Sequence, residues 1–207
     1  MGAVLNDDRP RILTVCTGNV CRSPYMERVL RQIVDRAWGP GAVVVESAGT
    51  GALVGQPMDR GSESILRAAG VDADGFVARQ IERDHVAASD LVLTATRTHR
   101  GPVAQLHPRA LRYTFAIGDF VDLANSIPDD ALPATDDAGE WIRGITQLVA
   151  GRRGLVSPRH ATEIDVVDPF RRDQSVFEEM AARLDSLRPS LTRALGRAGL
   201  ARSRGEG

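Results

Sequence analysis

Lysine is absent from this sequence, so all 26 of its basic residues are arginine. The 27 acidic residues leave a formal net charge of −1, which provides no overall positive field and argues against extensive nucleic-acid binding. We attribute the missing lysine chiefly to a GC-rich coding bias. One physical consequence is that the basic surface groups are guanidinium groups, which are not neutralised by deprotonation.

Cysteine and long apolar runs are also scarce. The sequence has 2 cysteines, Cys16 and Cys21, and a pair so close together cannot cross-link a fold, which argues against a disulfide-dependent secreted domain. No segment has the roughly 20 apolar residues that span a membrane, and residues 1–11 lack the apolar stretch of a signal peptide. We therefore expect a cytoplasmic protein that does not insert into membranes.

A phosphate-binding loop is predicted at residues 16–24, which read Cys-Thr-Gly-Asn-Val-Cys-Arg-Ser-Pro. The loop follows an apolar run and precedes a helical pattern, and backbone N–H groups that enter a helix N-terminus attract a tetrahedral oxyanion. Arg22 can donate two further hydrogen bonds to that anion. The same positive surroundings favour the thiolate form of Cys16, which is the attacking form of a cysteine nucleophile.

Other residues of this segment suit a tight loop. Gly18 lets the chain curl without a Cβ clash, and Asn19 tolerates a left-handed turn while its amide bonds across the loop. Ser23 can cap the following helix and donate a hydrogen bond to the thiolate. These residue types predict a loop whose side chains support its own conformation.

Strand and helix patterns alternate along the chain. Short apolar runs predict strands over residues 11–15, 42–46, 90–94 and 112–116. Amphipathic patterns predict helices from the loop to Gly39, over 58–69, over 96–106 and through 176–187, with Pro189 kinking or interrupting the last one. This order predicts a three-layer α/β fold: a central parallel sheet of about four strands flanked by helices, with the phosphate-binding loop after the first strand.

The loop resembles the active-site loop of the low-molecular-weight protein tyrosine phosphatases. Two further segments fit the family in the same order, Ser47-Ala-Gly-Thr50 and Asp168-Pro-Phe170, and residues 47–70 resemble bacterial members that act on tyrosine kinases of polysaccharide export. The resemblance covers about residues 10–124 and 164–188. It implies hydrolysis of phosphotyrosine through a phosphocysteine intermediate, without cofactor or metal. It also implies phosphotyrosine proteins as partners, with a bacterial tyrosine kinase as one candidate.

The resemblance also implies roles for individual residues. Cys16 is the expected nucleophile, Arg22 the phosphoryl-binding side chain and Asp168 the general acid, with Asp165 as the competing acid. The expected substrate-binding set is Thr17, Gly18, Asn19, Val20, Cys21, Ser23 and Phe170, the last as an aromatic wall. Cys21 stands where family members can form a reversible disulfide with the nucleophile. The four histidines, His85, His99, His107 and His160, show no metal-ligand spacing, and we expect them to be structural or solvated.

Residues 125–163 depart from the family, whose members usually cross this region through a much shorter loop. We interpret residues 1–200 as a single phosphatase domain with this insertion, followed by a disordered tail at 201–207. Trp141, Ile145 and Leu148 predict an amphipathic helix that anchors the insertion. We expect the insertion to approach the mouth of the phosphate loop, where Arg152, Arg153 or Arg159 can meet acidic or phosphorylated partners. The alternative is a solvated elaboration that makes no contact near the site.

Three other functions compete with phosphotyrosine hydrolysis. Related protein-arginine phosphatases share this loop, although they carry a hydroxyl residue where this chain has Val20, and an apolar side chain there suits a phenyl ring better than a guanidinium group. Thioredoxin-coupled arsenate reductases share the fold but need redox cysteines downstream, which this sequence lacks. A non-catalytic phosphoprotein-binding module is the third alternative, and the intact Cys16, Arg22 and Asp168 argue against it.

Overall fold

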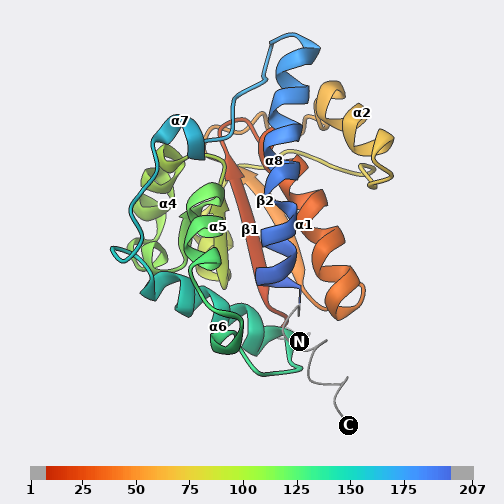
Figure 1. The fold of residues 1–207 in the computed structure, drawn as a ribbon. Coiled ribbons are helices and arrows are strands. Elements are labelled where there is room, and N and C mark those ends of the chain that lie inside the picture. Colours follow the sequence, from red (N-terminus) through yellow and green to blue (C-terminus); the bar gives the residue numbers. More distant parts are fainter. Residues whose placement is uncertain (1–7, 197–207) are drawn as a thin grey trace, which may run out of the picture.

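The sheet lies at the centre of the molecule and all its strands are parallel (Figure 1). The structure is a computed structural model that describes residues 8–196, so the predicted tail at 201–207 lies outside the described residues. The 4-stranded sheet has the order β2-β1-β3-β4, with bounds β1 Arg11–Cys16, β2 Val44–Gly49, β3 Leu91–Thr94 and β4 Thr114–Ala116. The four predicted strands are confirmed, although β2 begins two residues later than its apolar run indicated.

Helices cover both faces of the sheet, which confirms the predicted three layers. Alternate residues of β1 point to opposite faces, so that Ile12 joins one buried cluster while Leu13 and Val15 join the other. The larger cluster involves α1 Arg22–Trp38, α5 Ile117–Asn125, α6 Ala138–Gly151 and α8 Gln174–Leu195. The smaller one involves α3 Arg83–Ala87, α4 Arg100–Leu106 and the 3-10 helix η2 Pro108–Arg112. The remaining elements are short: α2 Arg60–Ala68, η1 Arg97–His99, η3 Asp129–Ala131 and α7 Ala161–Ile164.

Pro189 does not interrupt the last helix. Helix α8 runs from Gln174 to Leu195 with Pro189 inside it, so of the two expected effects, a kink or an interruption, the interruption is wrong. A proline inside a helix costs about 3 kcal/mol in isolation. Here Leu187, Leu191 and Leu195 are all buried on the core side of the helix, and this packing offsets the cost.

The insertion contributes to the main core instead of covering the phosphate loop. The predicted amphipathic helix is present as α6, and Trp141 and Ile145 are fully buried, whereas Leu148 is 37% exposed and therefore is no anchor. The Trp141 Nε1–H donates to the Ala194 carbonyl at 2.9 Å, and Arg143 lies 3.6 Å from Asp90, just before β3 begins. Figure 1 shows α6 at the end of the sheet where β1 starts. Helix α6 therefore lies away from the phosphate loop, and whether the rest of the insertion controls access to the mouth of the loop stays a prediction.

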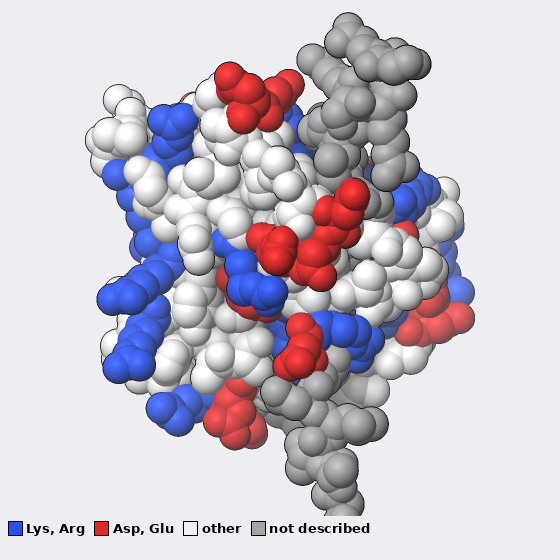
Figure 2. All heavy atoms as spheres, turned by 90° about the horizontal axis from the view of Figure 1, so that it is seen from below, with Lys and Arg blue, Asp and Glu red and all other residues white. Residues whose placement is uncertain are grey.

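Charge is mixed on the end of the molecule that carries α6. Basic and acidic side chains lie among one another across the middle of this face (Figure 2), in keeping with a formal net charge of −1. Within residues 8–196, no helix is both long enough and apolar enough to cross a membrane.

Candidate active site

The predicted phosphate loop lies at the carboxyl end of β1, where it leads into α1. In parallel sheets this edge is where ligands bind. A cavity of about 130 Å³ opens there, lined by Cys16, Thr17, Gly18, Val20, Cys21, Arg22, Gly51, Leu53, Asp168 and Phe170. The structure therefore brings six residues of the loop together with Asp168 and Phe170 of the distant Asp-Pro-Phe segment. Asn19 and Ser23, which were also expected to bind substrate, are fully buried and do not line this cavity. Sequence reasoning missed Gly51 and Leu53.

Asn19 takes the left-handed conformation in this loop. Its φ of 54° lies in the region that L-residues rarely adopt, and its side chain compensates with hydrogen bonds. The Asn19 Nδ2 group donates to Ser23 Oγ at 2.9 Å and to Ser47 Oγ at 3.0 Å, and Asn19 Oδ1 accepts the Arg79 backbone N–H at 2.8 Å. The prediction for Asn19 is thus confirmed. Gly18 is different, because a Cβ there would meet only an ordinary contact of 3.6 Å, so the curl of the loop does not depend on it.

The side chains of Asn19, Ser23 and Ser47 form a chain of hydrogen bonds beside Cys16. Asn19 donates to Ser23 Oγ, so the one hydroxyl proton of Ser23 has two possible acceptors: Cys16 Sγ at 3.0 Å and, farther away, the Ala48 carbonyl at 3.4 Å. Asn19 also donates to Ser47, whose own hydroxyl proton goes to Glu27 Oε2 at 2.6 Å. Ser23 therefore supports a negative sulfur. Its expected second role as a helix cap is wrong, because α1 already begins at Arg22 and the residue before it makes no side-chain cap.

The segment after β2 holds the carbonyl groups of the loop. The carbonyls of Cys16, Thr17, Gly18 and Val20 accept backbone N–H groups from residues 50–59 at 2.8–3.0 Å. Gly49, which pairs with Cys16 in the sheet, must be glycine because an added Cβ would lie 2.4 Å from the Thr17 carbonyl oxygen. This requirement was missed from the sequence. The only available signal was the Ser-Ala-Gly-Thr motif itself, which does not show that its glycine is crowded.

Asp168 faces the loop and pairs with Arg22. The Arg22 Nη2 group donates to Asp168 Oδ2 at 2.7 Å, with Arg22 nearly buried and the Asp168 side chain 51% exposed. The second oxygen of Asp168 accepts the Phe170 backbone N–H at 3.3 Å. Asp165, the competing acid, accepts the backbone N–H of Arg97 at 2.9 Å and does not line the cavity. The Nε atom of Arg22 is buried and has no partner within the described residues.

Apolar side chains form the walls of the cavity. Val20 and Leu53 line it together with Phe170, and Val20 is buried while Leu53 is 40% exposed at the rim. The Arg171 guanidinium lies 5.1 Å from the centroid of the Phe170 ring. A flat apolar group can therefore lie above the loop between these side chains.

Cys21 is buried beside the nucleophile position. Both cysteines are free thiols, and burial, with smaller contributions from Asp59 and Cys16, raises the pKa of Cys21. Cys21 is therefore a protonated thiol at neutral pH.

His99 lies at the phosphate loop, which sequence reasoning did not anticipate. Its Nε2 is 2.9 Å from Thr17 Oγ1 and its Nδ1 is 2.6 Å from Thr96 Oγ1, and it is buried. Burial, and then the positive charge of Arg22, lower the pKa of His99 to about 4, so the ring is neutral at pH 7. A usable signal was present, because η1 follows the carboxyl end of β3 and so reaches the same edge as Cys16. Within the part of the chain that the structure describes, no group of histidine, cysteine and carboxylate side chains could hold a metal ion.

Comparison with known proteins identifies relatives of this arrangement. The family model for low molecular weight phosphotyrosine protein phosphatase matches residues 11–134. The chain is 33% identical over 147 residues to the probable low molecular weight protein-tyrosine-phosphatase EpsP of Ralstonia nicotianae, covering 70% of this chain and 97% of the relative. The tyrosine phosphatase AmsI of Erwinia amylovora superposes with a TM-score of 0.65 at 23% identity, over 91% of this chain and 95% of its own. YwlE of Bacillus subtilis, an arginine phosphatase, superposes with a TM-score of 0.64 at 20% identity, over 91% and 97% of the two chains. At these identities the two structures establish the fold alone.

Proposed function

The chain belongs to the low molecular weight phosphotyrosine protein phosphatase family, and on that basis we propose that Cys16, Arg22 and Asp168 carry its activity. The protein is an enzyme that hydrolyses phosphotyrosine. One observation supports this assignment of residues above all: the Cys16 sulfur, which lies 3.0 Å from the Ser23 hydroxyl, lines one cavity of about 130 Å³ together with a guanidinium and a carboxyl group. Both cysteines of the sequence line this cavity.

The first step transfers the phosphoryl group to the enzyme. The Cys16 thiolate attacks phosphorus in line with the phenolic oxygen, so that an S–P bond forms and the P–O bond to tyrosine breaks. Arg22 and the backbone N–H groups of the loop bind the three equatorial oxygens, whose charge they stabilise in the transition state. The Asp168 carboxyl group donates its proton to the leaving phenolate.

The second step returns the enzyme to its starting form. Water attacks phosphorus and gives a proton to the Asp168 carboxylate, the S–P bond breaks and the Cys16 thiolate leaves. The hydroxyl of Ser23, 3.0 Å from Cys16 Sγ, stabilises this leaving thiolate. His99 acts as a positioning residue because its neutral ring holds Thr17 at the start of the loop.

The ion pair of Arg22 with Asp168 couples substrate binding to acid catalysis. A phosphate dianion competes with Asp168 for the Arg22 guanidinium, which now lies 2.7 Å from the carboxylate. Once the dianion holds Arg22, the Asp168 carboxyl group is released from its ion pair and can turn toward the leaving phenolic oxygen.

The cavity walls favour phosphotyrosine over phosphoarginine. Val20, Leu53 and Phe170 offer an aromatic ring apolar contacts, whereas the guanidinium of phosphoarginine needs polar partners that these walls do not supply. Turnover of matched phosphotyrosine and phosphoarginine peptides tests this preference. A higher kcat/KM for the phosphoarginine peptide would contradict it.

A Cys16→Ser variant should lose turnover of both peptides but keep phosphate binding. Residual turnover would contradict the assignment of Cys16 as the nucleophile.

Cys21 gives the site a protective redox partner. Peroxide converts the Cys16 thiolate to a sulfenic acid, and the Cys21 thiol condenses with it to a disulfide and water, which a thiol reductant reverses. The burial of both cysteines in one cavity supports this role.

The partner class we propose is phosphotyrosine proteins of the bacterial cytoplasm, with a tyrosine kinase as the first candidate.

A further inference from the structure

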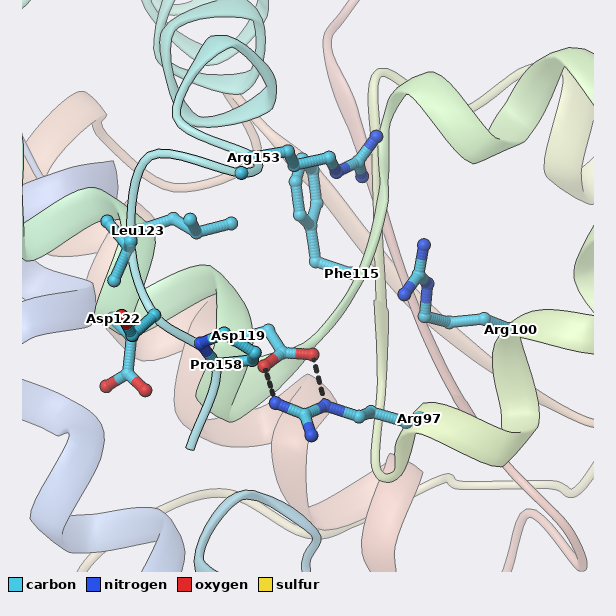
Figure 3. A pocket seen from close by; sticks show the side chains of 11 residues that line it. Arg97, Arg100, Phe115, Asp119, Asp122, Leu123, Arg153 and Pro158 are labelled. Carbon is cyan, nitrogen blue, oxygen red and sulfur yellow. Dashed lines mark hydrogen bonds and ion pairs between the residues drawn. The ribbon is translucent and has the colours of Figure 1, made fainter. Parts of the chain in front are cut away.

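A second cavity, separate from the Cys16 cavity, lies between α5, β4 and the end of the insertion (Figure 3). It has a volume of about 290 Å³, and the two cavities share no lining residue. The insertion supplies one wall, from Arg153 to Pro158, while Phe115 and Leu123 contribute apolar surface. This volume is at the lower end of the range for small-molecule sites, roughly 300 to 1,000 Å³.

The two carboxylates of this cavity are already neutralised. Asp119 forms a two-pronged ion pair with Arg97 at 2.6 and 2.9 Å, drawn as dashed lines in Figure 3. Asp122 forms a similar pair with Arg159, both hydrogen bonds being 2.7 Å long. Arg159 thus pairs with Asp122 while its side chain stays 40% exposed, and its expected contact with a partner stays a prediction.

Two guanidinium groups remain without a carboxylate among the described residues. Arg153 donates to the carbonyls of Leu111 and Thr114 and lies 4.1 Å over the Phe115 ring, contacts that fix its position but use only part of its five N–H donors. Arg100 extends from α4 toward Phe115 (Figure 3), and its buried Nε atom has no hydrogen-bond partner within the described residues. Burying positive charge without a counter-ion is unfavourable.

The positive charges of Arg100 and Arg153 also repel each other. Burial, and then the charge of Arg100, lower the pKa of Arg153. An anion between the two guanidinium groups would relieve this repulsion and provide the acceptor that Arg100 lacks.

We propose that this cavity binds a small organic anion. Its oxyanion head, a carboxylate or a phosphate group, accepts hydrogen bonds from Arg100 and from the free N–H groups of Arg153. Its apolar body packs against Phe115, Leu123 and Pro158.

The test uses benzoate as the carboxylate probe and phenylphosphonate as the phosphate probe. Because phenylphosphonate also suits the Cys16 cavity, both probes are titrated by calorimetry into an Arg22→Ala variant, with and without Arg100→Gln. Arg109→Gln is the matched control, since Arg109 is an exposed residue of η2 that does not line the cavity. Binding of either probe to Arg22→Ala is expected, and which probe binds identifies the head group.

The expected result is that Arg100→Gln weakens this binding roughly tenfold to a hundredfold, as the loss of a charged hydrogen bond does. Arg109→Gln should leave it unchanged. Without probe, Arg100→Gln should unfold at the same temperature as its parent, since the Arg100 side chain has no hydrogen-bond partner to lose among the described residues. An unchanged thermal midpoint then shows that weaker binding is not caused by misfolding. Absence of binding to Arg22→Ala, or equal binding with and without Arg100→Gln, would overturn the proposal.

Discussion

Replacing Gly49 by alanine should damage catalysis without dismantling the fold. A Cβ at this position would lie 2.4 Å from the Thr17 carbonyl oxygen and 3.0 Å from the Cβ atoms of Asn19 and Ala52. The shortest contact must lengthen by about 0.6 Å before it reaches about 3.0 Å, below which real Cβ contacts are essentially never seen. The Thr17 carbonyl also accepts the Gly51 N–H at 3.0 Å, so the loop has little freedom to move away.

The displacement falls on the phosphate loop, because Gly49 pairs with Cys16 in the sheet and a Cβ at Gly49 would crowd Thr17, the next residue of the loop. A misplacement of about 1 Å in an active site can cost about a hundredfold in rate, so we expect kcat/KM on p-nitrophenyl phosphate to fall roughly tenfold to a hundredfold. The strain should lower the free energy of unfolding by about 1–3 kcal/mol. Steady-state kinetics and urea unfolding measure the two effects on one preparation.

The matched control is Gly101→Ala in α4, a glycine that does not line the Cys16 cavity. An added Cβ there would meet no heavy atom within 4 Å, so activity should stay close to that of the unmodified enzyme and stability should not fall. Wild-type kcat/KM in Gly49→Ala, or an equal loss in both variants, would refute the argument that loop geometry depends on this one glycine.

Three further predictions concern individual side chains. Asp168→Asn should slow hydrolysis of aryl phosphates with poor leaving groups by about 10²- to 10⁴-fold and affect good leaving groups least, as a series of substituted phenyl phosphates can show; the same pattern in Asp165→Asn instead would move the acid to that residue. His99 has a pKa of about 4 in the folded state, below the unfolded value near 6.5, so its contribution to stability is complete above pH 6.5 and is lost as the pH falls toward 4. Between pH 7 and pH 5 this loss should be about 2 kcal/mol in urea unfolding, and His99→Asn should flatten the dependence; identical pH profiles for the two proteins would remove His99 as its source. Cys21→Ser should fail to recover activity when peroxide treatment is followed by a thiol reductant, whereas the unmodified enzyme recovers, and equal recovery would exclude a resolving role for Cys21.

The features that the sequence predicted well are those set by nearby residues. The Cys16 loop, the left-handed Asn19 and the alternating strands and helices depend on local residue types, and all were anticipated. Helix α6 was also anticipated, because Trp141 and Ile145 repeat at helical spacing. The location of α6 was not, since a periodic pattern shows that a face is buried but not what covers it.

The features that sequence reasoning missed depend on contacts between distant segments. His99 reaches Thr17 across 82 positions of the chain, and the crowding at Gly49 comes mainly from Thr17 and Asn19 of the phosphate loop. The continuity of α8 through Pro189 likewise follows from buried leucines and not from the proline itself. Local propensity cannot reveal such contacts, because they arise when the sheet is assembled.

The position of the tryptophans determines what optical spectroscopy can report about this enzyme. The chain has 2 tryptophans, and the rings of Trp38 and Trp141 lie 5.7 Å apart, one at the end of α1 and the other in the insertion. Neither lines the Cys16 cavity. Tryptophan fluorescence should therefore change little when phosphate binds. Separation of α6 from the rest of the domain should change both the intensity and the wavelength of the emission. Tryptophan fluorescence thus reports whether the insertion is packed against the domain.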